Sequence, residues 1–422
     1  MRFPRRLYSP LAVATATLLA ACGESLGPGE IKGLPRALTQ AEGALVRANN
    51  TFAFKVFQAI ADGAGPDSNV FISPLSASMA LAMAYNGAAG VTQTEMQHAL
   101  ALDEMTLDDV NRSNQSLIAL LRGLDRRVAF TLANSVWYRQ GFTLLPNFLT
   151  ATRTYFDATV QSLDFSSPSA PSTINGWVSN ATQGKIPTIV PDPISPDVVA
   201  YLINAIYFKG NWTTQFKKSF TAPGAFHLRS GSATTVPMMT HGDEVSFGRT
   251  SDGGITLIDL PYGGKAFSMT ILLPRDPGGV DSLVPALTAE RWSAWTTGLD
   301  APSAAVSQHI YLPKFAMTYG LSMNDVLSAL GMPSAFDCDG TADFTRMAML
   351  PAGKLCITDV RHKATVDVNE EGTEAAAATS VESGVTSAPV PVLVDRPFVF
   401  MIRERFSGAI LFMGRVMNPI AS

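Results

Sequence analysis

The sequence predicts one α+β domain, in which helices come first and strands follow. With 422 residues, of which 46% are hydrophobic, the chain can bury a large core. Helical patterns dominate up to Thr182 and strand patterns from Val198 onward, an order typical of α+β proteins. Neither an internal repeat nor a linker divides the body of the chain, so we expect one domain rather than several.

The helices are predicted from apolar spacing and helix-forming composition. We expect them over 41–61, 76–85, 92–100, 107–124, 146–156, 172–182 and 321–330. The third opens with Thr92-Gln-Thr-Glu95, a capping-box pattern. A β-rich run predicts a strand over 129–138, and the helix over 321–330 is expected to be the main interruption of the later strands.

The first 44 residues are predicted to be a targeting segment and a tether. A basic start precedes the apolar stretch 11–21, which has the length of a signal-peptide core. The stretch ends in Leu19-Ala-Ala-Cys22, which resembles the bacterial lipobox. By that resemblance, residues 1–21 are a lipoprotein signal peptide, Cys22 carries the lipid and 22–44 form a lipid-anchored tether. An ordinary secretory signal with a chance cysteine is the alternative.

Several function classes are disfavoured by composition and spacing. The net charge is −4 and no basic cluster stands out, so no nucleic-acid partner is expected. The five histidines lack metal-ligand spacing, and no cofactor motif is present. No motif places a Ser or Cys nucleophile beside a base, so we do not expect an enzyme. Lys217 and Lys218 are interpreted as an isolated, solvated pair.

Two further cysteines, Cys338 and Cys356, could form a disulfide in an exported protein. Gly340, Pro351 and Gly353 would let the intervening loop close. Sequence alone does not establish the required geometry. We therefore favour two separate thiols, with Cys356 at least partly buried, and keep the bridge as the alternative.

The most informative segment is Val368-Asn-Glu-Glu-Gly-Thr-Glu-Ala-Ala-Ala-Ala-Thr379. It reads as a strand that ends at Glu370 or Glu371, a glycine pivot and a run of small residues. In an extended chain, alternate residues face opposite sides, so the small residues from Thr373 would share one face and the glutamates the other. The segment could therefore join a sheet with its charges in water. A flexible or helical alanine patch is the alternative.

These residues resemble the hinge and reactive-centre loop of the serpins, a family of serine protease inhibitors. The resemblance extends from about Asn49 to Pro419. Further family-like motifs are Asn69–Ser76, Leu202–Trp212, Leu260–Tyr262, Ile271–Pro274, Asp395–Arg403 and Gly408–Val416. The resemblance implies a serpin fold with about nine helices and three β-sheets, in a domain over 45–422 with an exposed reactive-centre loop over 370–394.

The resemblance also implies a mechanism. In a serpin, a protease attacks the loop as a substrate, the cleaved loop inserts into the central sheet, and the acyl-enzyme is trapped. The expected partner is thus a target serine protease, held in a covalent complex, although some serpins also trap papain-like cysteine proteases. A non-inhibitory serpin that acts as a binding or folding-assistance module is the alternative. With its lipid anchor, the protein is expected at the cell envelope, on the outer membrane or the cell surface.

The reactive bond is placed by family spacing. Counts forward from Glu370 and back from Pro397 both give Thr386–Ser387, with Val385–Thr386 as the alternative. Either bond follows a small, β-branched residue, which favours elastase-like or subtilisin-like proteases.

The remaining site residues are also assigned by resemblance and fall into three groups. They are the hinge (Glu370, Glu371, Gly372, Thr373, Ala375 and Ala377), the shutter (Ser73, Ser76, Asn204 and His362) and the breach (Trp212, with Lys314 paired to Glu370). A buried polar shutter stabilises the protein only if its groups are hydrogen-bonded. His362 could instead be a catalytic base, but no nucleophile motif accompanies it.

Overall fold

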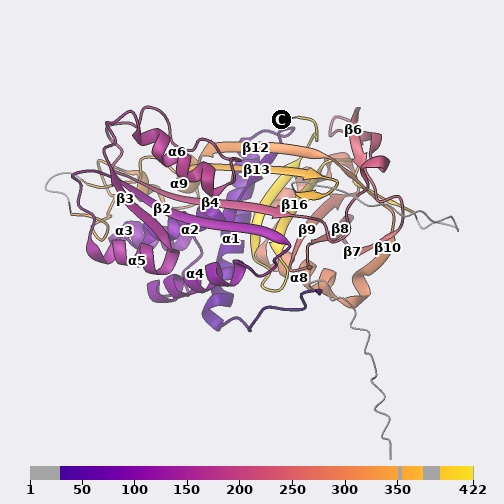
Figure 1. The fold of residues 1–422 in the computed structure, drawn as a ribbon, viewed down its shortest axis with the longest axis horizontal. Helices are drawn as coiled ribbons and strands as arrows, with labels where there is room; N and C mark the ends of the chain where they lie inside the picture. The colour runs from indigo at the N-terminus through magenta and orange to yellow at the C-terminus, as the bar shows by residue number, and fades with distance from the viewer. Residues whose placement is uncertain (1–28, 350–353, 374–389, 422) are drawn as a thin grey trace, which may run out of the picture. The chain divides into compact units, whose positions relative to one another are not determined.

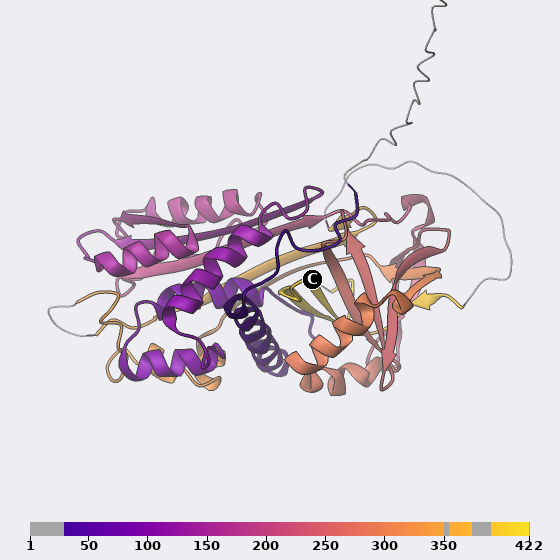
Figure 2. The ribbon, with the colours of Figure 1, turned by 90° about the horizontal axis from the view of Figure 1, so that it is seen from below.

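A computed structural model describes residues 29–349, 354–373 and 390–421 (Figures 1 and 2). One compact unit begins at Ile31. Over the described ranges it contains nine α-helices together with seventeen strands. This mixture has the α+β character that the sequence predicts.

The helices follow the predicted order. They are α1 (Gln40–Gly63), α2 (Pro74–Tyr85), α3 (Gly90–Ala99), α4 (Leu107–Leu121), α5 (Pro146–Phe156), α6 (Ala170–Ala181), α7 (Val280–Leu283), α8 (Ala289–Asp300) and α9 (Asn324–Ala329). Helices α7 and α8 were missed, and α9 is shorter than expected because Leu321 and Ser322 belong to a strand.

The predicted capping box of α3 is wrong. The helix begins at Gly90, so Thr92 lies inside it and is fully buried. The Thr92 hydroxyl accepts a hydrogen bond from the backbone N–H of Asp343, and the Glu95 carboxylate accepts one from Ser334 N–H. Both side chains therefore bind a distant segment of the chain instead of capping their own helix.

Within the described ranges, the strands form four hydrogen-bonded sheets where three were expected. The seven-stranded sheet has the order β1 (Val70–Ile72), β17 (Ile410–Val416), β16 (Phe398–Glu404), β9 (Phe267–Pro274), β8 (Ile255–Tyr262), β7 (Val245–Asp252), β10 (Ala305–Gln308). The four-stranded sheet has the order β15 (Val392–Leu393), β11 (Ile310–Pro313), β6 (Ala233–Met239), β5 (Ala222–His227). Two three-stranded sheets have the orders β12 (Phe315–Ser322), β13 (Arg361–Asn369), β14 (Gly372–Thr373) and β3 (Ala158–Leu163), β2 (Val128–Arg139), β4 (Ala200–Gly210).

The two three-stranded sheets are the halves of one interrupted layer. Figure 1 shows the long strands β12, β13, β4 and β2 side by side, in that order. Over the described residues, β4 and β13 belong to different hydrogen-bonded sheets. The fourth sheet therefore arises because the central layer is split between β4 and β13.

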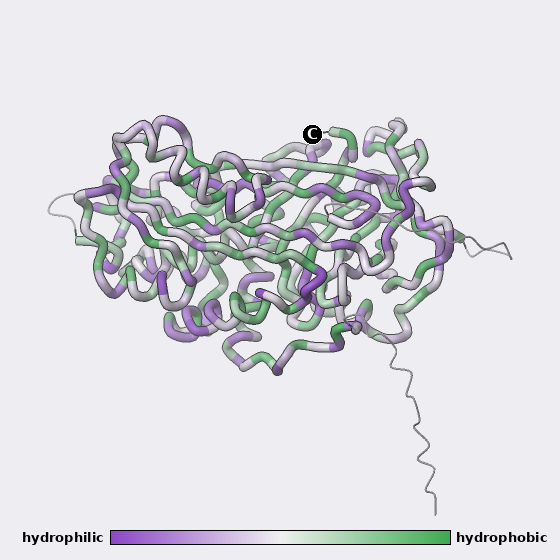
Figure 3. The backbone as a smooth tube through the Cα atoms, in the orientation of Figure 1, coloured by the Kyte–Doolittle hydropathy of each residue, from purple (hydrophilic) through white to green (hydrophobic). Residues whose placement is uncertain are grey.

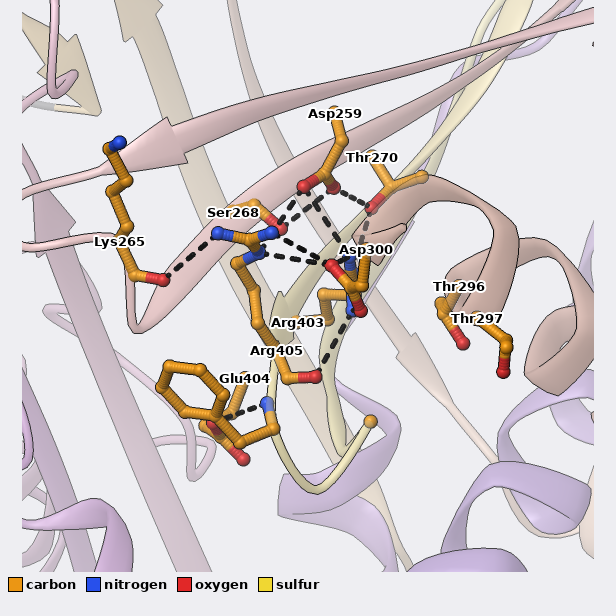
Figure 4. A network of polar contacts seen from close by, with 12 residues as sticks. Asp259, Lys265, Ser268, Thr270, Thr296, Thr297, Asp300, Arg403, Glu404 and Arg405 are labelled. Carbon is orange, nitrogen blue, oxygen red and sulfur yellow. Dashed lines mark hydrogen bonds and ion pairs between the residues drawn. The ribbon is translucent and has the colours of Figure 1, made fainter. Parts of the chain in front are cut away.

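The centre of the unit is strongly hydrophobic, and Figure 3 shows hydrophobic stretches of the chain running through it. Every residue of β16 and β17 is buried. Among them is Arg403, whose guanidinium lies 2.9 Å from an Asp300 oxygen and 3.3 Å from Asp259 (Figure 4). Because this buried cation has two carboxylate partners, the network satisfies a charge that would otherwise be costly.

The structure differs from the sequence interpretation at the two cysteines. Cys338 and Cys356 form a disulfide, with their Cα atoms 4.9 Å apart. The bridge joins the turn after the short 3₁₀ helix Pro333–Phe336 to the segment that leads into β13. Gly340 lies in this turn, two residues after Cys338.

Candidate functional site

The split between β4 and β13 contains two cavities. One of about 140 Å³ lies between the first half of β4, at Tyr201–Ala205, and the start of β13, at Arg361–Lys363. The second, of about 40 Å³, lies between Ile206–Phe208 and Thr365–Asp367. Thr373 of β14 lines the second cavity. The gap is therefore open along much of both strands. The hinge lies at the C-terminal end of the gap, where β4 and β13 finish.

The hinge turns back from β13, and the two residues after the turn, Gly372 and Thr373, lie in the gap. Gly372 pairs with Asn369, and Thr373 pairs with Val368, both antiparallel. On its other side, Gly372 forms an antiparallel bridge with Asn211, which directly follows β4. A single strand thus spans the gap at this point, so β4 and β13 are separated there by the width of one strand. Because β14 is antiparallel to both, β4 and β13 run parallel.

Gly372 is required by its surroundings. Its φ is +149°, and a Cβ atom there would lie 2.1 Å from the carbonyl oxygen of Gly210 and 2.6 Å from Asn211 Cα. No side chain fits between the turn and the backbone of β4 at these distances. The glycine therefore permits a close approach of two backbones as well as an unusual dihedral angle.

The backbone of the hinge turn is held by the segment that follows β4. Trp212 N–H donates to the carbonyl oxygen of Glu371 at 2.9 Å, and Phe216 N–H donates to that of Glu370 at 2.8 Å. The indole Nε1 of Trp212 donates to the carbonyl oxygen of Asn369 at 2.9 Å. These bonds satisfy three consecutive carbonyl groups, so the turn is fixed to the body of the protein.

The two hinge glutamates are buried, and each pairs with a lysine. Lys314 Nζ lies 3.0 Å from Glu370 Oε2, and Thr221 donates to Glu370 Oε1 at 2.9 Å. Burial alone would raise the pKa of Glu370, but its own backbone N–H, Lys314 and Thr221 hold that pKa below its usual value. Lys218 pairs with Glu371 while its own side chain remains 58% exposed, so it is solvated, as the sequence suggested, but it is not isolated.

An aromatic cluster supports the inserted end of the hinge. The ring of Trp212 stacks on Tyr262 with centroids 4.5 Å apart, and Phe216 packs edge-on against Trp212 and stacks on His241. The hydroxyl groups of Tyr262 and Thr373 are hydrogen-bonded at 3.0 Å. Burial raises the pKa of Tyr262, so this hydroxyl stays protonated and can donate to Thr373.

The four shutter residues lie around the beginning of α2. Ser73 caps the helix by accepting from Ser76 N–H, and its hydroxyl donates to the carbonyl oxygen of Leu411. Ser73 N–H donates to His362 Nε2 at 3.0 Å, while the Ser76 hydroxyl donates to the carbonyl oxygen of Asn204 at 3.1 Å. The network thus connects α2 with both strands that border the gap.

Two features of this network are relevant to opening of the sheet. Burial lowers the pKa of His362 to about 4, so the ring is neutral at neutral pH and accepts from Ser73. Asn204 donates to Asn134 Oδ1 at 2.7 Å, whereas its own Oδ1 has no partner among the described residues. Asn204 lines the larger cavity, so a polar acceptor is available beside the gap.

The other predicted site residues lie outside the described residues. They are Ala375, Ala377, Thr386, Ser387 and Cys22. Of the predicted residues that are described, the structure brings together Glu370–Thr373, Trp212 and Lys314 at the C-terminal end of the gap. The four shutter residues lie together beside the N-terminal half of the two strands.

Sequence reasoning missed Tyr262, Phe216, Lys218 and Thr221 as hinge contacts, and it missed His241 as the ring that stacks on Phe216. Tyr262 was recognised within a family-like motif, but its hydrogen bond to Thr373 connects positions far apart in the chain. The buried Glu371 could have indicated that a cation was needed nearby, and Lys218 supplies it. The other contacts had no local sequence signal.

The described residues contain neither a membrane-spanning helix nor a metal-binding group of side chains. None of the helices in 29–349, 354–373 and 390–421 has both the length and the apolar character needed to cross a membrane. Within the same ranges, no three His, Cys, Asp or Glu side chains gather as a metal site would require.

Comparison with known proteins assigns the family. The family model for serpins, described as serine protease inhibitors, matches residues 47–419. The leukocyte elastase inhibitor of Sus scrofa is 36% identical over 385 residues, covering 89% of this chain and 99% of that protein. The protein Iris of Ixodes ricinus is 36% identical, covering 82% of this chain and 92% of that protein.

Solved structures agree with this assignment. The thermophilic serpin tengpin in its native state superposes with a TM-score of 0.79 at 29% identity, covering 91% of this chain and 95% of that one. Human thyroxine-binding globulin, solved with thyroxine, gives a TM-score of 0.80 at 28% identity, covering 90% and 100%. The chain belongs to the serpin family and has the serpin fold.

Proposed function

We propose that this protein is a suicide-substrate inhibitor of serine proteases. A target protease cleaves the reactive loop, the loop inserts between β4 and β13, and the acyl-enzyme is trapped. In this reaction the chain supplies no catalytic group of its own. The relatives named as inhibitors support serine protease inhibition as a general role, and the open gap supports the insertion step.

The observation that carries the proposal is the hinge in the mouth of the gap. Gly372 already pairs with the backbone on both sides, as each residue of an inserted strand would. A backbone hydrogen bond contributes about 0.5–1.5 kcal/mol net, so a strand that forms two ladders gains many such increments. Insertion would also fill both cavities and offer a partner to the unpaired Asn204 oxygen.

The specificity and location of the inhibitor are parts of the same proposal. We place the reactive bond at Thr386–Ser387, with Val385–Thr386 as the alternative, which favours elastase-like or subtilisin-like targets. Papain-like cysteine proteases form a second target class. We further propose cleavage of the signal peptide before Cys22 and lipid anchoring through it, at the outer membrane or the cell surface.

The test uses residues from Gly23 onward with an elastase-like and a subtilisin-like protease, followed by denaturing gels and mass spectrometry. A covalent complex and a released peptide that starts at Ser387 are expected. Thr373→Arg should turn the inhibitor into a substrate, because inserting a charged side chain into the sheet is too costly. Thr94→Arg, at an exposed position on α3, is the matched control and should still inhibit.

Two results would count against the proposal. Cleavage without a stable complex across a broad protease panel would favour a non-inhibitory serpin that acts as a binding or folding-assistance module. Undiminished trapping by Thr373→Arg would show that loop insertion is not the trapping step.

A further inference from the structure

The disulfide connects one side of the larger cavity to the helices. The segment Lys354–Cys356 lines the cavity of about 140 Å³ between β4 and β13, and we call this segment the cavity wall. Its bridge partner Cys338 follows the 3₁₀ helix Pro333–Phe336, in which Ser334 is hydrogen-bonded to two side chains of α3. The bridge therefore ties the cavity wall, through the 3₁₀ helix, to α3.

The cavity wall has few other attachments. Farther along the chain, the backbone N–H groups of Ile357 and Val360 are hydrogen-bonded to the body of the protein. Among the described residues, by contrast, the backbone of Leu355 and Cys356 makes no hydrogen bond. Lys354 Nζ donates to a carbonyl oxygen in the turn that carries Cys338, and the Leu355 side chain packs at the edge of the core. The bridge is therefore the main link that fixes the cavity wall.

The bridge is accessible to a reductant. Cys338 lies at an exposed position, whereas Cys356 is half-buried, so a thiolate can approach the sulfur of Cys338. When a dithiol reacts, its first thiolate bonds to Cys338 Sγ, the bond between the two cysteines breaks, and Cys356 leaves and takes up a proton. The second thiol of the reductant then displaces Cys338. The bridge gains two electrons and two protons, and the dithiol becomes a disulfide.

An inserting strand would need the cavity wall as a partner. Thr373 pairs with Val368, and in an antiparallel ladder each further residue would pair one position closer to Arg361, where β13 begins. The proposed bond after Thr386 is farther along the chain from Thr373 than Arg361 is from Val368, so the end of the strand would pass the start of β13. Beyond that point the cavity wall borders the gap. A loose wall would have to be ordered during insertion, which costs conformational entropy.

We propose that the Cys338–Cys356 bridge is a redox switch that sets how efficiently the inhibitor traps its protease, an inference that rests on the proposed function. In the oxidised protein, the cavity wall is fixed and receives the end of the inserted strand. In the reduced protein, the wall is loose and the last part of insertion is slower, so water hydrolyses more of the acyl-enzyme before it is trapped. Reduction by a dithiol thus converts the inhibitor toward a substrate.

The experiment compares the oxidised protein with protein that is reduced by dithiothreitol and freed of it before the protease is added. In the form from Gly23 onward, Cys338 and Cys356 are the only cysteines, so the reductant acts on this bridge alone. Two quantities are measured below the melting temperature of the reduced protein: the stoichiometry of inhibition and hydrogen–deuterium exchange at the Leu355 and Cys356 amides. Cys338→Ser/Cys356→Ser removes the bridge, and Lys354→Met is the matched control, because it keeps the bridge and loses one side-chain bond.

We expect reduction to raise the stoichiometry of inhibition about threefold or more and to speed exchange of the two amides about tenfold or more. The double serine variant should match the reduced protein with or without dithiothreitol, and Lys354→Met should match the oxidised wild type.

Reoxidation should restore the original stoichiometry, and a loss that persists would be damage and would overturn the switch. If the oxidised protein traps a protease and reduction changes the stoichiometry by less than about 1.5-fold, the switch is overturned and the proposed function stands, even when exchange is faster. If the double variant does not fold, the reduced wild type decides alone, since it is folded before reduction. Failure of the oxidised protein to trap any protease would overturn both proposals.

Discussion

Replacing Gly372 by alanine should expel the hinge from the gap. The new methyl group would lie 2.1 Å from the carbonyl oxygen of Gly210, more than 1 Å inside an ordinary contact of about 3.5 Å. The φ of +149° adds about 1–3 kcal/mol of strain for a residue with a side chain. Neither penalty can be relieved while Gly372 pairs with both Asn369 and Asn211.

The interactions that keep the inserted hinge in place are of similar size. They consist mainly of the pairing of Gly372 and Thr373 with β13 and the hydroxyl bond to Tyr262. Three hydrogen bonds at about 0.5–1.5 kcal/mol each give about 1.5–4.5 kcal/mol. Strain and steric overlap together exceed this value, so the equilibrium should favour the expelled hinge.

The assay is hydrogen–deuterium exchange at the Thr373 amide. Loss of about 1.4–3 kcal/mol of protection corresponds to exchange about 10–100 times faster in Gly372→Ala than in the wild type. Gly298→Ala in α8 is the matched control, because a Cβ there meets nothing within 4 Å and alanine favours a helix. If the Thr373 amide stayed as protected in Gly372→Ala as in the wild type, the inferred close approach of the two backbones would be wrong.

Three further predictions concern the breach, the shutter and the disulfide. Lys314→Met should leave Glu370 buried without its cation and destabilise the hinge by about 1–2 kcal/mol, measured as faster hinge exchange. The folded-state pKa of His362, about 4, lies below its usual 6.5, so stability is complete above about pH 6.5 and falls as the pH drops toward 4, by about 3 kcal/mol in all. The melting temperature should follow this change, and less so in His362→Gln. Reduction of Cys338–Cys356 should lower the melting temperature, because about 3 kcal/mol of loop closure is lost.

Each of these predictions can fail in a distinct way. Hinge exchange in Lys314→Met equal to that in Lys55→Met, an exposed lysine on α1, would mean that the ion pair does not hold the hinge. A wild-type melting temperature that is flat between pH 6.5 and 4.5 would contradict a buried, neutral His362. Identical melting curves for reduced and oxidised protein would show that the bridge does not stabilise the fold.

Sequence reasoning succeeded where the signal is local. A run of helix-forming residues behind Pro74 predicted α2 to within two residues, and the range 146–156 matches α5 at both ends. It failed where the hydrogen-bond partner of a side chain lies in a distant segment of the sequence. Thr92 and Glu95 have the spacing of a capping box, yet their side chains accept hydrogen bonds from the backbone N–H groups of Asp343 and Ser334. A local pattern does not reveal which of two competing partners will win.

The hinge illustrates the same limit within the candidate site. The sequence around Gly372 predicted a pivot followed by small residues, and the family resemblance paired Glu370 with Lys314. It did not predict that Gly372 and Thr373 already lie between two strands, because this depends on how far β4 and β13 are held apart. That separation is set by tertiary contacts, among them the shutter hydrogen bonds of Ser73 to His362 and Ser76 to Asn204.

The gap between β4 and β13 favours the pairing of a further strand. The facing edges of β4 and β13 present backbone groups that a further strand can satisfy, and such edges ordinarily attract other strands. Here the first residues of the hinge occupy the entrance, where Gly372 is the residue type that fits. The same geometry that would admit the protein's own loop would also admit the loop of a second copy. The contacts that hold Glu370 and Glu371 therefore stabilise the hinge at the entrance, and weakening them should expose the gap to either strand.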